Sequence, residues 1–228
     1  MKYLTFSTVE GLSDYFDLCC EITINEDAVV SIEESAILDV KERLRFNGDV
    51  LIRDNVRIAG RDIELGHKFY ADHHAEIGGG SCYGSKSRLK IGDCFHMGCY
   101  SLINTAREVI IGDVVGMGRF SSIHTHGAYL SVLDGFPEQW GPVHIGNNVW
   151  LPNATVLPNV TIGSNTVVAN NSLVNKDIEG GGLWAGIPVK RIMGVNYPNP
   201  MHSQDRIAYL EGFKNCDEEE LRRHGIRN

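Results

Sequence analysis

Aliphatic residues recur at every sixth position over much of the second half of the chain. Residues 145–174 read IGNNVW, LPNATV and then, after a step shortened by one residue, IGSNTV and VANNSL. The aliphatic residues that open these steps are Ile145, Leu151, Leu157, Ile162, Val168 and Val174. A six-residue period is typical of a parallel β-helix, in which each face of a triangular coil requires one inward aliphatic side chain.

The same spacing begins further upstream and is interrupted before it resumes. Aliphatic or Met residues are six apart at Ile91, Met97, Ile103 and Val109, and after a shift of two the count continues at Ile111, Met117 and Ile123. We expect such shifts at corners, because inside a strand they would turn core side chains outward. The longest interruption predicts an external loop over residues 124–143, and loops of this size on a rigid scaffold usually carry function.

The pattern divides the chain into a central solenoid and two flanking segments. Residues 1–49 alternate as strands do but lack clear hexads, which predicts an N-terminal β extension that begins the stack. Residues 50–195 are the predicted β-helix, with Gly and Asn between the aliphatic positions, where tight corners require left-handed backbone angles. The pattern stops at residue 196, and residues 196–228 predict a C-terminal cap of one or two amphipathic helices. The fold class is therefore all-β.

Composition narrows the classes of function. The 228 residues carry a formal net charge of −8 without a Lys/Arg cluster, which argues against nucleic acid and anionic membrane surfaces as partners. No apolar run approaches membrane length, and the first residues are too polar for a signal peptide. The six cysteines are scattered and are interpreted as reduced thiols of a cytoplasmic protein.

Four segments in a fixed order carry a family resemblance. They read IHTHGAYL, GPVHIGNNVWLPNATVLPNVTIG, SLVNKDI and AGIPVKRI, and together they lie within about residues 89–193. In these segments the chain resembles the hexapeptide-repeat acyltransferases, in particular the galactoside and maltose O-acetyltransferases and the polysaccharide O-acetyltransferases. The resemblance implies a left-handed parallel β-helix, a homotrimer, and acetyl-CoA as co-substrate.

The resemblance also assigns roles to particular residues. His126 begins the long loop where the family has its catalytic histidine, and His124 is the runner-up. Imidazole suits a general base at neutral pH. The resemblance further implies contacts to coenzyme A, with an aromatic residue beside the pantetheine arm, small residues where backbone approaches the cofactor, and cations near its phosphates: Trp150, Ala169, Lys176, Ala185, Lys190 and Arg191.

The acceptor is left open by departures from the family pattern. The galactoside enzymes place an Asn before the catalytic loop, whereas the stretch HMGCYSLINT offers no match there and Asn104 is only nearby. We expect direct transfer of an acetyl group to a hydroxyl or amine of a sugar or nucleotide-sugar. No metal is expected. The alternatives are a γ-carbonic-anhydrase-like zinc hydratase, for which His96, His124 and His126 would have to converge between subunits, and a non-catalytic β-helix used for assembly.

Overall fold

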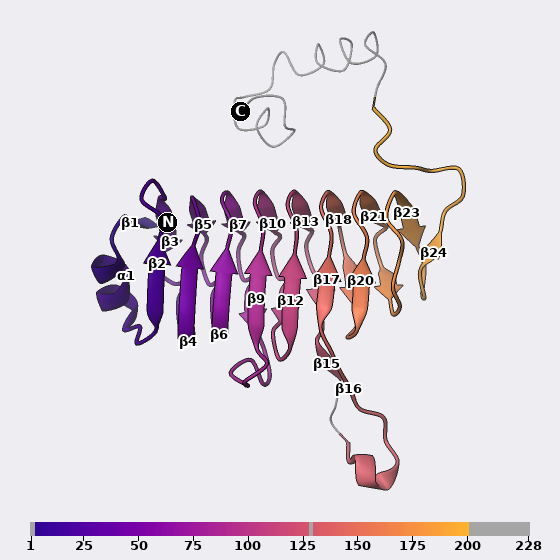
Figure 1. The fold of residues 1–228 in the computed structure, drawn as a ribbon, viewed down its shortest axis with the longest axis horizontal. Helices are drawn as coiled ribbons and strands as arrows, with labels where there is room; N and C mark the ends of the chain where they lie inside the picture. Colours follow the sequence, from indigo (N-terminus) through magenta and orange to yellow (C-terminus); the bar gives the residue numbers. More distant parts are fainter. Residues whose placement is uncertain (1–2, 128–129, 201–228) are drawn as a thin grey trace. The chain divides into compact units, whose positions relative to one another are not determined.

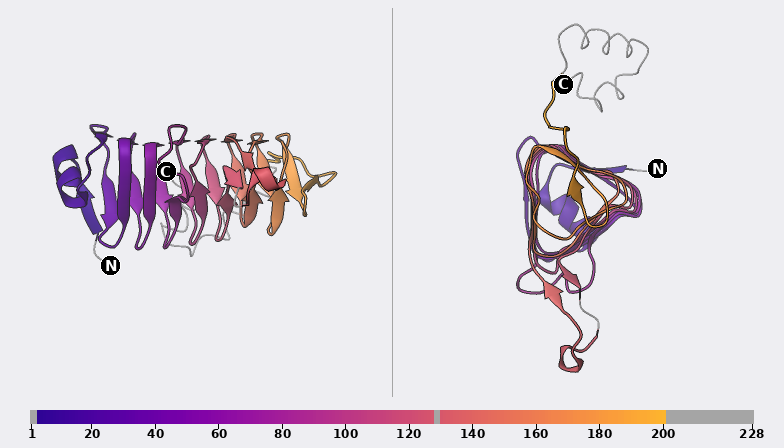
Figure 2. Two further views of the ribbon diagram at one scale, coloured as in Figure 1. Left: turned by 90° about the horizontal axis from the view of Figure 1, so that it is seen from below. Right: turned by 90° about the vertical axis from the view of Figure 1, so that its right-hand side faces the viewer.

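The part of the chain that forms a β-solenoid lies within residues 3–197. The computed structural model describes residues 3–127 and 130–200. Figure 1 shows successive parallel strands side by side along one axis, and the end view in Figure 2 shows the coils of this unit superimposed as a triangle. This confirms the all-β solenoid that the six-residue period predicts. In chain order we call its three sides face A, face B and face C.

Face A is a parallel ladder closed by an antiparallel strand at each end. The closing strands are β1 (Tyr3–Phe6) and β24 (Lys190–Arg191). The parallel strands between them are β3 (Val30–Glu33), β5 (Val50–Ile52), β7 (Phe69–Ala71), β10 (Phe95–Met97), β13 (Val115–Met117), β18 (Val149–Leu151), β21 (Thr166–Val168) and β23 (Gly182–Ala185).

Faces B and C form one continuous sheet, because two long strands turn the corner between them. These strands are β4 (Ile37–Phe46) and β6 (Arg57–Leu65). Face B continues through β8 (Glu76–Gly78), β11 (Leu102–Asn104), β14 (Ser122–Ile123), β19 (Ala154–Val156) and β22 (Ser172–Val174). Face C contains β2 (Glu21–Ile24), β9 (Arg88–Ile91), β12 (Glu108–Ile111), β17 (Val143–Ile145) and β20 (Val160–Ile162).

The core is the interior of the coils, and the hexad residues fill it. All the aliphatic and Met positions of the predicted repeat are buried except Leu157. Leu157 is half-buried at a corner, and its neighbour Val156 takes the core position in β19. The shortened step therefore lies one coil side earlier than predicted. It is the two-residue turn Pro152–Asn153 between β18 and β19. The corresponding turn of the next coil, between β21 and β22, has three residues.

The shift of two residues at Val109 corrects the expectation that every shift lies at a corner. Val109 and Ile111 both belong to β12, and both are buried. Alternate residues of a strand point to the same side, so a shift of two keeps core residues in the core. Only a shift by an odd number has to be absorbed at a corner.

The N-terminal residues join the same stack but include a helix that the sequence pattern did not predict. Helix α1 (Val9–Phe16) begins after Thr8, whose side chain accepts a hydrogen bond from Gly11 N at 3.3 Å, and it buries Leu12 fully. Parallel pairing of β3 with β5 and of β4 with β6 then crosses the predicted boundary at residue 49 without interruption.

At the other end, residues 196–200 contain neither helix nor strand, and the rest of the predicted C-terminal cap, residues 201–228, lies outside the described residues. Within residues 3–127 and 130–200 no helix has the length and apolar character needed to cross a membrane.

The corner between faces C and A is the most regular part of the coil. We call it the glycine corner; it consists of residues 66–68, 92–94, 112–114, 146–148 and 163–165, and each triplet starts with Gly. The third residue of each has a positive φ, between 55° and 60°. The middle side chains form a ladder, in which Asp113 Oδ1 accepts from Asp93 N and Asn147 Oδ1 accepts from Asp113 N, both at 2.8 Å. Each coil therefore closes on the next through the same contact.

Candidate active site

Two loops leave the solenoid at the corner between faces B and C. We call this the loop corner; it consists of residues 79–87, 105–107, 124–142, 157–159 and 175–177. The loops are residues 79–87 and 124–142, and one coil with the tight corner 105–107 separates them. Figure 1 shows both projecting from the lower edge of the solenoid. The longer of the two lies between β14 and β17, where the sequence predicts an external loop near residues 124–143.

His126 stands at the base of the longer loop. The loop starts as a short antiparallel pair of β15 (His126–Gly127) with β16 (Gln139–Trp140), and a 3-10 helix η1 (Val132–Asp134) lies near its tip. The imidazole is half-buried, and its Nδ1 lies 3.0 Å from Oδ1 of Asn104 on β11. The residue expected to act as base is thus fixed to the scaffold by a side chain from the coil before it.

The hydrogen bonds around Asn104 determine which imidazole nitrogen carries the proton. The Asn104 amide group donates to the carbonyl oxygens of Gly78 at 3.0 Å and Gly80 at 3.3 Å, so its Oδ1 is the acceptor. That Oδ1 also accepts from Thr125 Oγ1 at 2.6 Å. His126 Nδ1 must therefore donate, and the neutral ring keeps its lone pair on Nε2.

The other ring nitrogen, Nε2, faces a residue without a side chain. A Cβ atom built on Gly80 would lie 3.7 Å from His126 Nε2, so the shorter loop approaches this imidazole through backbone alone. Asn104 is 3% exposed, whereas Gly80 is exposed. The proton-bearing side of the imidazole is thus held by buried groups, and the basic side is directed to the space beside the loop of residues 79–87.

Trp140 holds the flank of the imidazole. Its ring stacks on His126 with centroids 4.6 Å apart and an interplanar angle of 14°. The Arg107 guanidinium carbon lies 4.1 Å from the centroid of the same indole. Trp140 Nε1 donates to the Glu138 carboxylate, so this acidic loop residue contacts the indole rather than the histidine. Histidine, indole and guanidinium form one connected group, which we call the His126 stack.

His124, the runner-up, is in a different environment. Its backbone N donates to Val156 O at 2.9 Å, a hydrogen bond to the following coil. Burial lowers the pKa of its imidazole below the usual range, and the neighbouring His126 lowers this pKa further. A ring with a lowered pKa stays neutral, but no hydrogen bond to the His124 ring is found within residues 3–127 and 130–200. Of these two histidines, only His126 has a ring oriented by a hydrogen bond within the described residues.

The residues predicted to contact coenzyme A are divided between two regions of the solenoid. Trp150 is exposed on face A, where its ring covers Gly116 of the preceding coil, and a Cβ on Gly116 would lie 2.5 Å from the indole. Ala169 N donates to Trp184 O at 2.8 Å, and Ala185 pairs with Lys190 in the last turn. These residues follow face A toward the C-terminal end of the solenoid.

Lys176 lies apart from that group. It is exposed at the loop corner, after β22, on the same corner as His126. Lys190 is exposed, while the Arg191 guanidinium donates to Gly181 O at 3.2 Å and to Asn196 Oδ1 at 3.0 Å. A single chain therefore does not bring all the predicted cofactor residues around one point.

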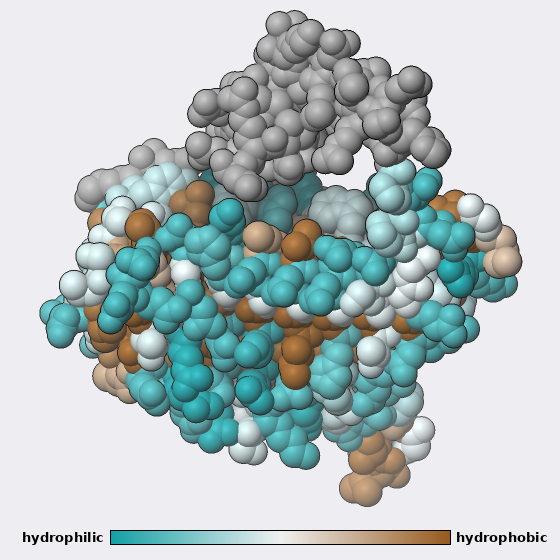
Figure 3. Space-filling view, turned by 45° about the horizontal axis from the view of Figure 1, so that its top comes forward, coloured by the Kyte–Doolittle hydropathy of each residue, from teal (hydrophilic) through white to brown (hydrophobic). Residues whose placement is uncertain are grey.

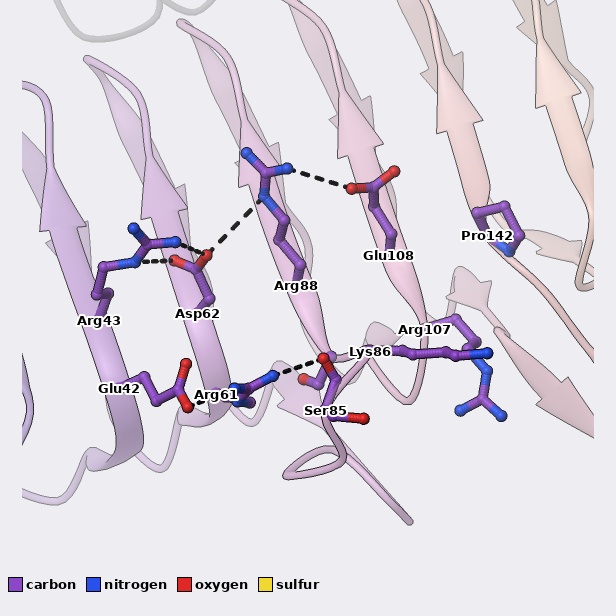
Figure 4. Close-up of a pocket in the computed structure, with 11 residues that line it drawn as sticks. Glu42, Arg43, Arg61, Asp62, Ser85, Lys86, Arg88, Arg107, Glu108 and Pro142 are labelled. Atoms are coloured by element: carbon purple, nitrogen blue, oxygen red, sulfur yellow. Dashed lines mark hydrogen bonds and ion pairs between the residues drawn. The ribbon is translucent and has the colours of Figure 1, made fainter.

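A polar pocket of about 560 Å³ lies beside the His126 stack, on face C next to the loop corner. Figure 4 shows its charged lining. Eleven residues line it, and the only apolar one is Pro142. The charged ones are Glu42, Arg43, Arg61, Asp62, Lys86, Arg88, Arg107 and Glu108.

Three contributors to the site were not assigned a role from the sequence. The sequence places Asn104 only near the position expected for the acceptor Asn, and it gives no signal for Trp140 or Arg107. Asn104 directly follows the core position Ile103, so its place beside a corner could be read from the period. Its contact with His126, 22 residues later, could not be predicted in this way, because the long loop interrupts the repeat that would align the two residues.

A scan against protein-family models found a match over residues 142–176, to the model described as bacterial transferase hexapeptide (six repeats). Residues 142–176 therefore match bacterial transferase hexapeptide repeats. The matched segment runs from Pro142 to Lys176 and contains the IGNNVW hexad. It supplies strands β17 to β22, two on each face, in the coils that directly follow the long loop. A search of curated proteins found no match.

Several solved structures that resemble the chain are acyltransferases. The N-acyltransferase AntD from Bacillus cereus, in complex with dTDP and 3-hydroxybutyryl-CoA, is 13% identical with a TM-score of 0.54 and covers 92% of this chain and 97% of its own. A maltose O-acetyltransferase from Clostridium difficile 630 is 23% identical with a TM-score of 0.46, covering 62% and 70%. A hexapeptide-repeat acetyltransferase from Vibrio cholerae is 23% identical with a TM-score of 0.46, covering 58% and 72%. The likeness to AntD supports the fold over nearly the whole chain.

The histidines of the zinc alternative are not gathered within one chain. His96 lies on β10 of face A, and His124 and His126 lie at the loop corner. In the described part of the chain, no group of three or more His, Cys, Asp or Glu side chains could hold a metal ion.

Proposed function

We propose that this protein is an acetyl-CoA-dependent acetyltransferase that acts on a hydroxyl or amine of a sugar or nucleotide-sugar. The observation that carries the proposal is the hydrogen bond between His126 Nδ1 and Asn104 Oδ1, because it leaves Nε2 unprotonated and directed outward. The hexapeptide repeats and the acyltransferases among the solved structures support the class of reaction.

The proposed reaction is one direct transfer. His126 Nε2 removes the proton of the acceptor hydroxyl or amine as the acceptor attacks the thioester carbonyl. The tetrahedral intermediate collapses by breaking the carbon–sulfur bond, and the imidazolium returns the proton to the departing thiolate. A general base in this role contributes about 10²–10⁴ in rate. The imidazolium that forms between the two steps keeps its hydrogen bond to Asn104 and its stack on Trp140.

A homotrimer belongs to this proposal, and so does the left-handed turn of the solenoid. Two features support a partner copy. The predicted cofactor residues lie on face A and at the loop corner of one chain, so a second chain is needed to bring the two groups together. The loop tip also exposes apolar side chains, with Leu133 94% exposed, and they appear brown at the lower edge of Figure 3. A cytoplasmic location follows from the same proposal, as the compartment that supplies acetyl-CoA.

The deciding experiment measures thiol release from acetyl-CoA in the presence of panels of sugars, sugar phosphates, nucleotide-sugars and amines. We expect His126→Ala to lower kcat and kcat/KM together by about 10²–10⁴, with acetyl-CoA affinity retained. His124→Ala is the matched control, and it should have a much smaller effect. Full activity of the His126→Ala enzyme would contradict the assignment of the base. If none of the acceptors in the panel stimulates thiol release, the proposed activity is wrong.

The cofactor side has its own test. Lys190 is exposed, and among the residues that the structure describes it is bonded only through the backbone of β24, so Lys190→Ala should raise KM for acetyl-CoA while kcat stays nearly constant. Lys68→Ala, at the glycine corner, serves as a lysine control. An unchanged KM would remove Lys190 from the site.

A further inference from the structure

The pocket of about 560 Å³ beside the His126 stack is of the size of a small-molecule site, but its lining is charged. We propose that it binds an anionic group, a phosphate or a carboxylate, of the acceptor. This inference rests on the proposed function and names the class of acceptor that the site would take.

The first row of side chains in the pocket neutralises itself. It runs along the outward side of face C through Arg43, Asp62, Arg88 and Glu108, with alternating signs. Arg43 Nε donates to Asp62 Oδ1 at 3.2 Å, and Arg88 Nη1 lies 3.4 Å from Glu108 Oε2. Figure 4 shows these pairs as a continuous chain of contacts across the strands. This row offers little net charge to a ligand.

The second row follows the loop corner and ends in excess positive charge. It starts with Glu42 and Arg61, whose Nη2 lies 2.5 Å from Glu42 Oε1. It ends with Lys86 and Arg107, and within the described ranges neither of these has a carboxylate at ion-pair distance. The pocket therefore has five cations against three carboxylates, in a chain with a net charge of −8. An anionic ligand would meet a local field opposite to that of the whole protein.

The loop that carries Lys86 is fixed by contacts of two residues that precede it, Tyr83 and Ser85. The Tyr83 hydroxyl donates to Asp39, and the pKa of Tyr83 is raised to about 12, first by burial and then by this carboxylate. Arg61 Nη1 donates to Ser85 O at 2.5 Å. These contacts order the backbone around Lys86 before a ligand binds, so the ordering cost of binding falls mainly on the lysine side chain.

The positive end of the pocket is also the end nearest the base. Figure 4 shows Lys86 extending toward Arg107. Arg107 lies over Trp140, and Trp140 stacks on His126. Because the shorter loop also supplies Gly80 next to Nε2, one loop carries both a cation of the pocket and the backbone beside the base. An acceptor held here by its anionic group would present a neighbouring hydroxyl or amine to His126.

The first experiment measures binding without catalysis, and therefore does not depend on the proposed function. Glucose 1-phosphate, glucuronate and neutral glucose are titrated into the full-length protein by calorimetry. Loss of one charge-assisted contact in Lys86→Gln should weaken binding of the anionic sugars about tenfold, and leave glucose unchanged. Lys68→Gln is the matched control at the glycine corner and should bind all three like the wild type. The ranking of the two anionic sugars distinguishes a phosphate site from a carboxylate site.

The outcomes separate the two proposals. If neither anionic sugar binds better than glucose, or if Lys86→Gln binds them as well as the wild type, the anion site is wrong. If they bind through Lys86 but no acceptor supports thiol release, the anion site stands and the acetyltransferase proposal fails. In the active enzyme, Lys86→Gln should raise KM for anionic acceptors about tenfold while KM for acetyl-CoA and kcat stay within about twofold.

Discussion

The glycine corner and the loop corner belong to the same coils and differ in what fills them. At the glycine corner five successive coils carry a triplet that starts with Gly, and the Cβ positions of these glycines are occupied by atoms of the next coil. At the loop corner, successive coils carry nine residues, then three, then nineteen. The contacts there are specific to each coil, as between Asn104 and His126 or between Tyr83 and Asp39.

The difference shows that in a repeat protein one corner of the coil can hold the stack together while another corner carries the functional side chains. Closure at the glycine corner fixes the spacing of the coils, so the chain can leave the solenoid at another corner and return in register. β12 pairs with β17 residue for residue, although the long loop intervenes between them. The loop corner is thus free to carry side chains that a regular coil could not hold, and the candidate active site lies there.

The largest expected effect comes from filling one position at the glycine corner. A Cβ on Gly112 would lie 3.0 Å from the carbonyl carbon of Gly146 and closer still to Asn147 Oδ1. Gly112→Ala should therefore lower the free energy of unfolding by about 1–3 kcal/mol. In the matched variant Gly84→Ala, on the shorter loop, the nearest contact is 3.5 Å and the change should stay within about 0.5 kcal/mol. Urea denaturation of both variants makes the comparison, and equal losses would show that the two corners do not differ in this way.

The next effect concerns the link between the loop and the coil. Asn104→Ala removes the acceptor of the His126 Nδ1–H bond, and it should lower kcat about 10- to 100-fold, since a hydrogen bond to a charged group contributes about 1.5–3 kcal/mol. Asn104→Asp separates positioning from packing, because a carboxylate beside the imidazole favours its protonated form. The acid limb of the kcat/KM profile should then move to higher pH. Loss of activity with an unchanged pH profile would indicate that Asn104 acts only through the fold.

The regular part of the molecule could be predicted from the sequence, because its physical requirement recurs. Each face needs one inward aliphatic per coil, so positions such as Met97 and Ile123 were identified by counting. The six-residue count gave the wrong core position where the length of a turn changes the spacing. Leu157 has the right spacing and side chain, but the short turn after β18 gives its core position to Val156. Helix α1 has no repeat to reveal it, and its capping residue Thr8 is one of many polar residues in the N-terminal segment.

The candidate site could be predicted only where a motif names it. His126 was found through the resemblance, and its orientation was not, because that depends on a contact across an interrupted repeat. The pocket was not foreseen at all. The two cations at its positive end come from different segments, Lys86 from loop 79–87 and Arg107 from the corner 105–107, which become neighbours only when the coils stack. Charged residues that meet between coils do not recur at a fixed spacing, so a single sequence does not reveal which of them become neighbours.

The smallest expected effect is a pH dependence of stability from His124, at the base of the loop. Burial lowers its pKa in the folded protein, while the unfolded chain has the ordinary value of about 6.5. The unfolded state therefore binds a proton first as the pH falls, and the stability present above about pH 6.5 is lost as the pH falls through the folded-state pKa. In His124→Gln, urea midpoints at pH 8 and pH 5 should differ less than in the wild type. His74→Gln, an exposed histidine on the opposite edge of face B, should retain the wild-type difference. An unchanged difference in His124→Gln would mean that the acid sensitivity comes from elsewhere in the solenoid.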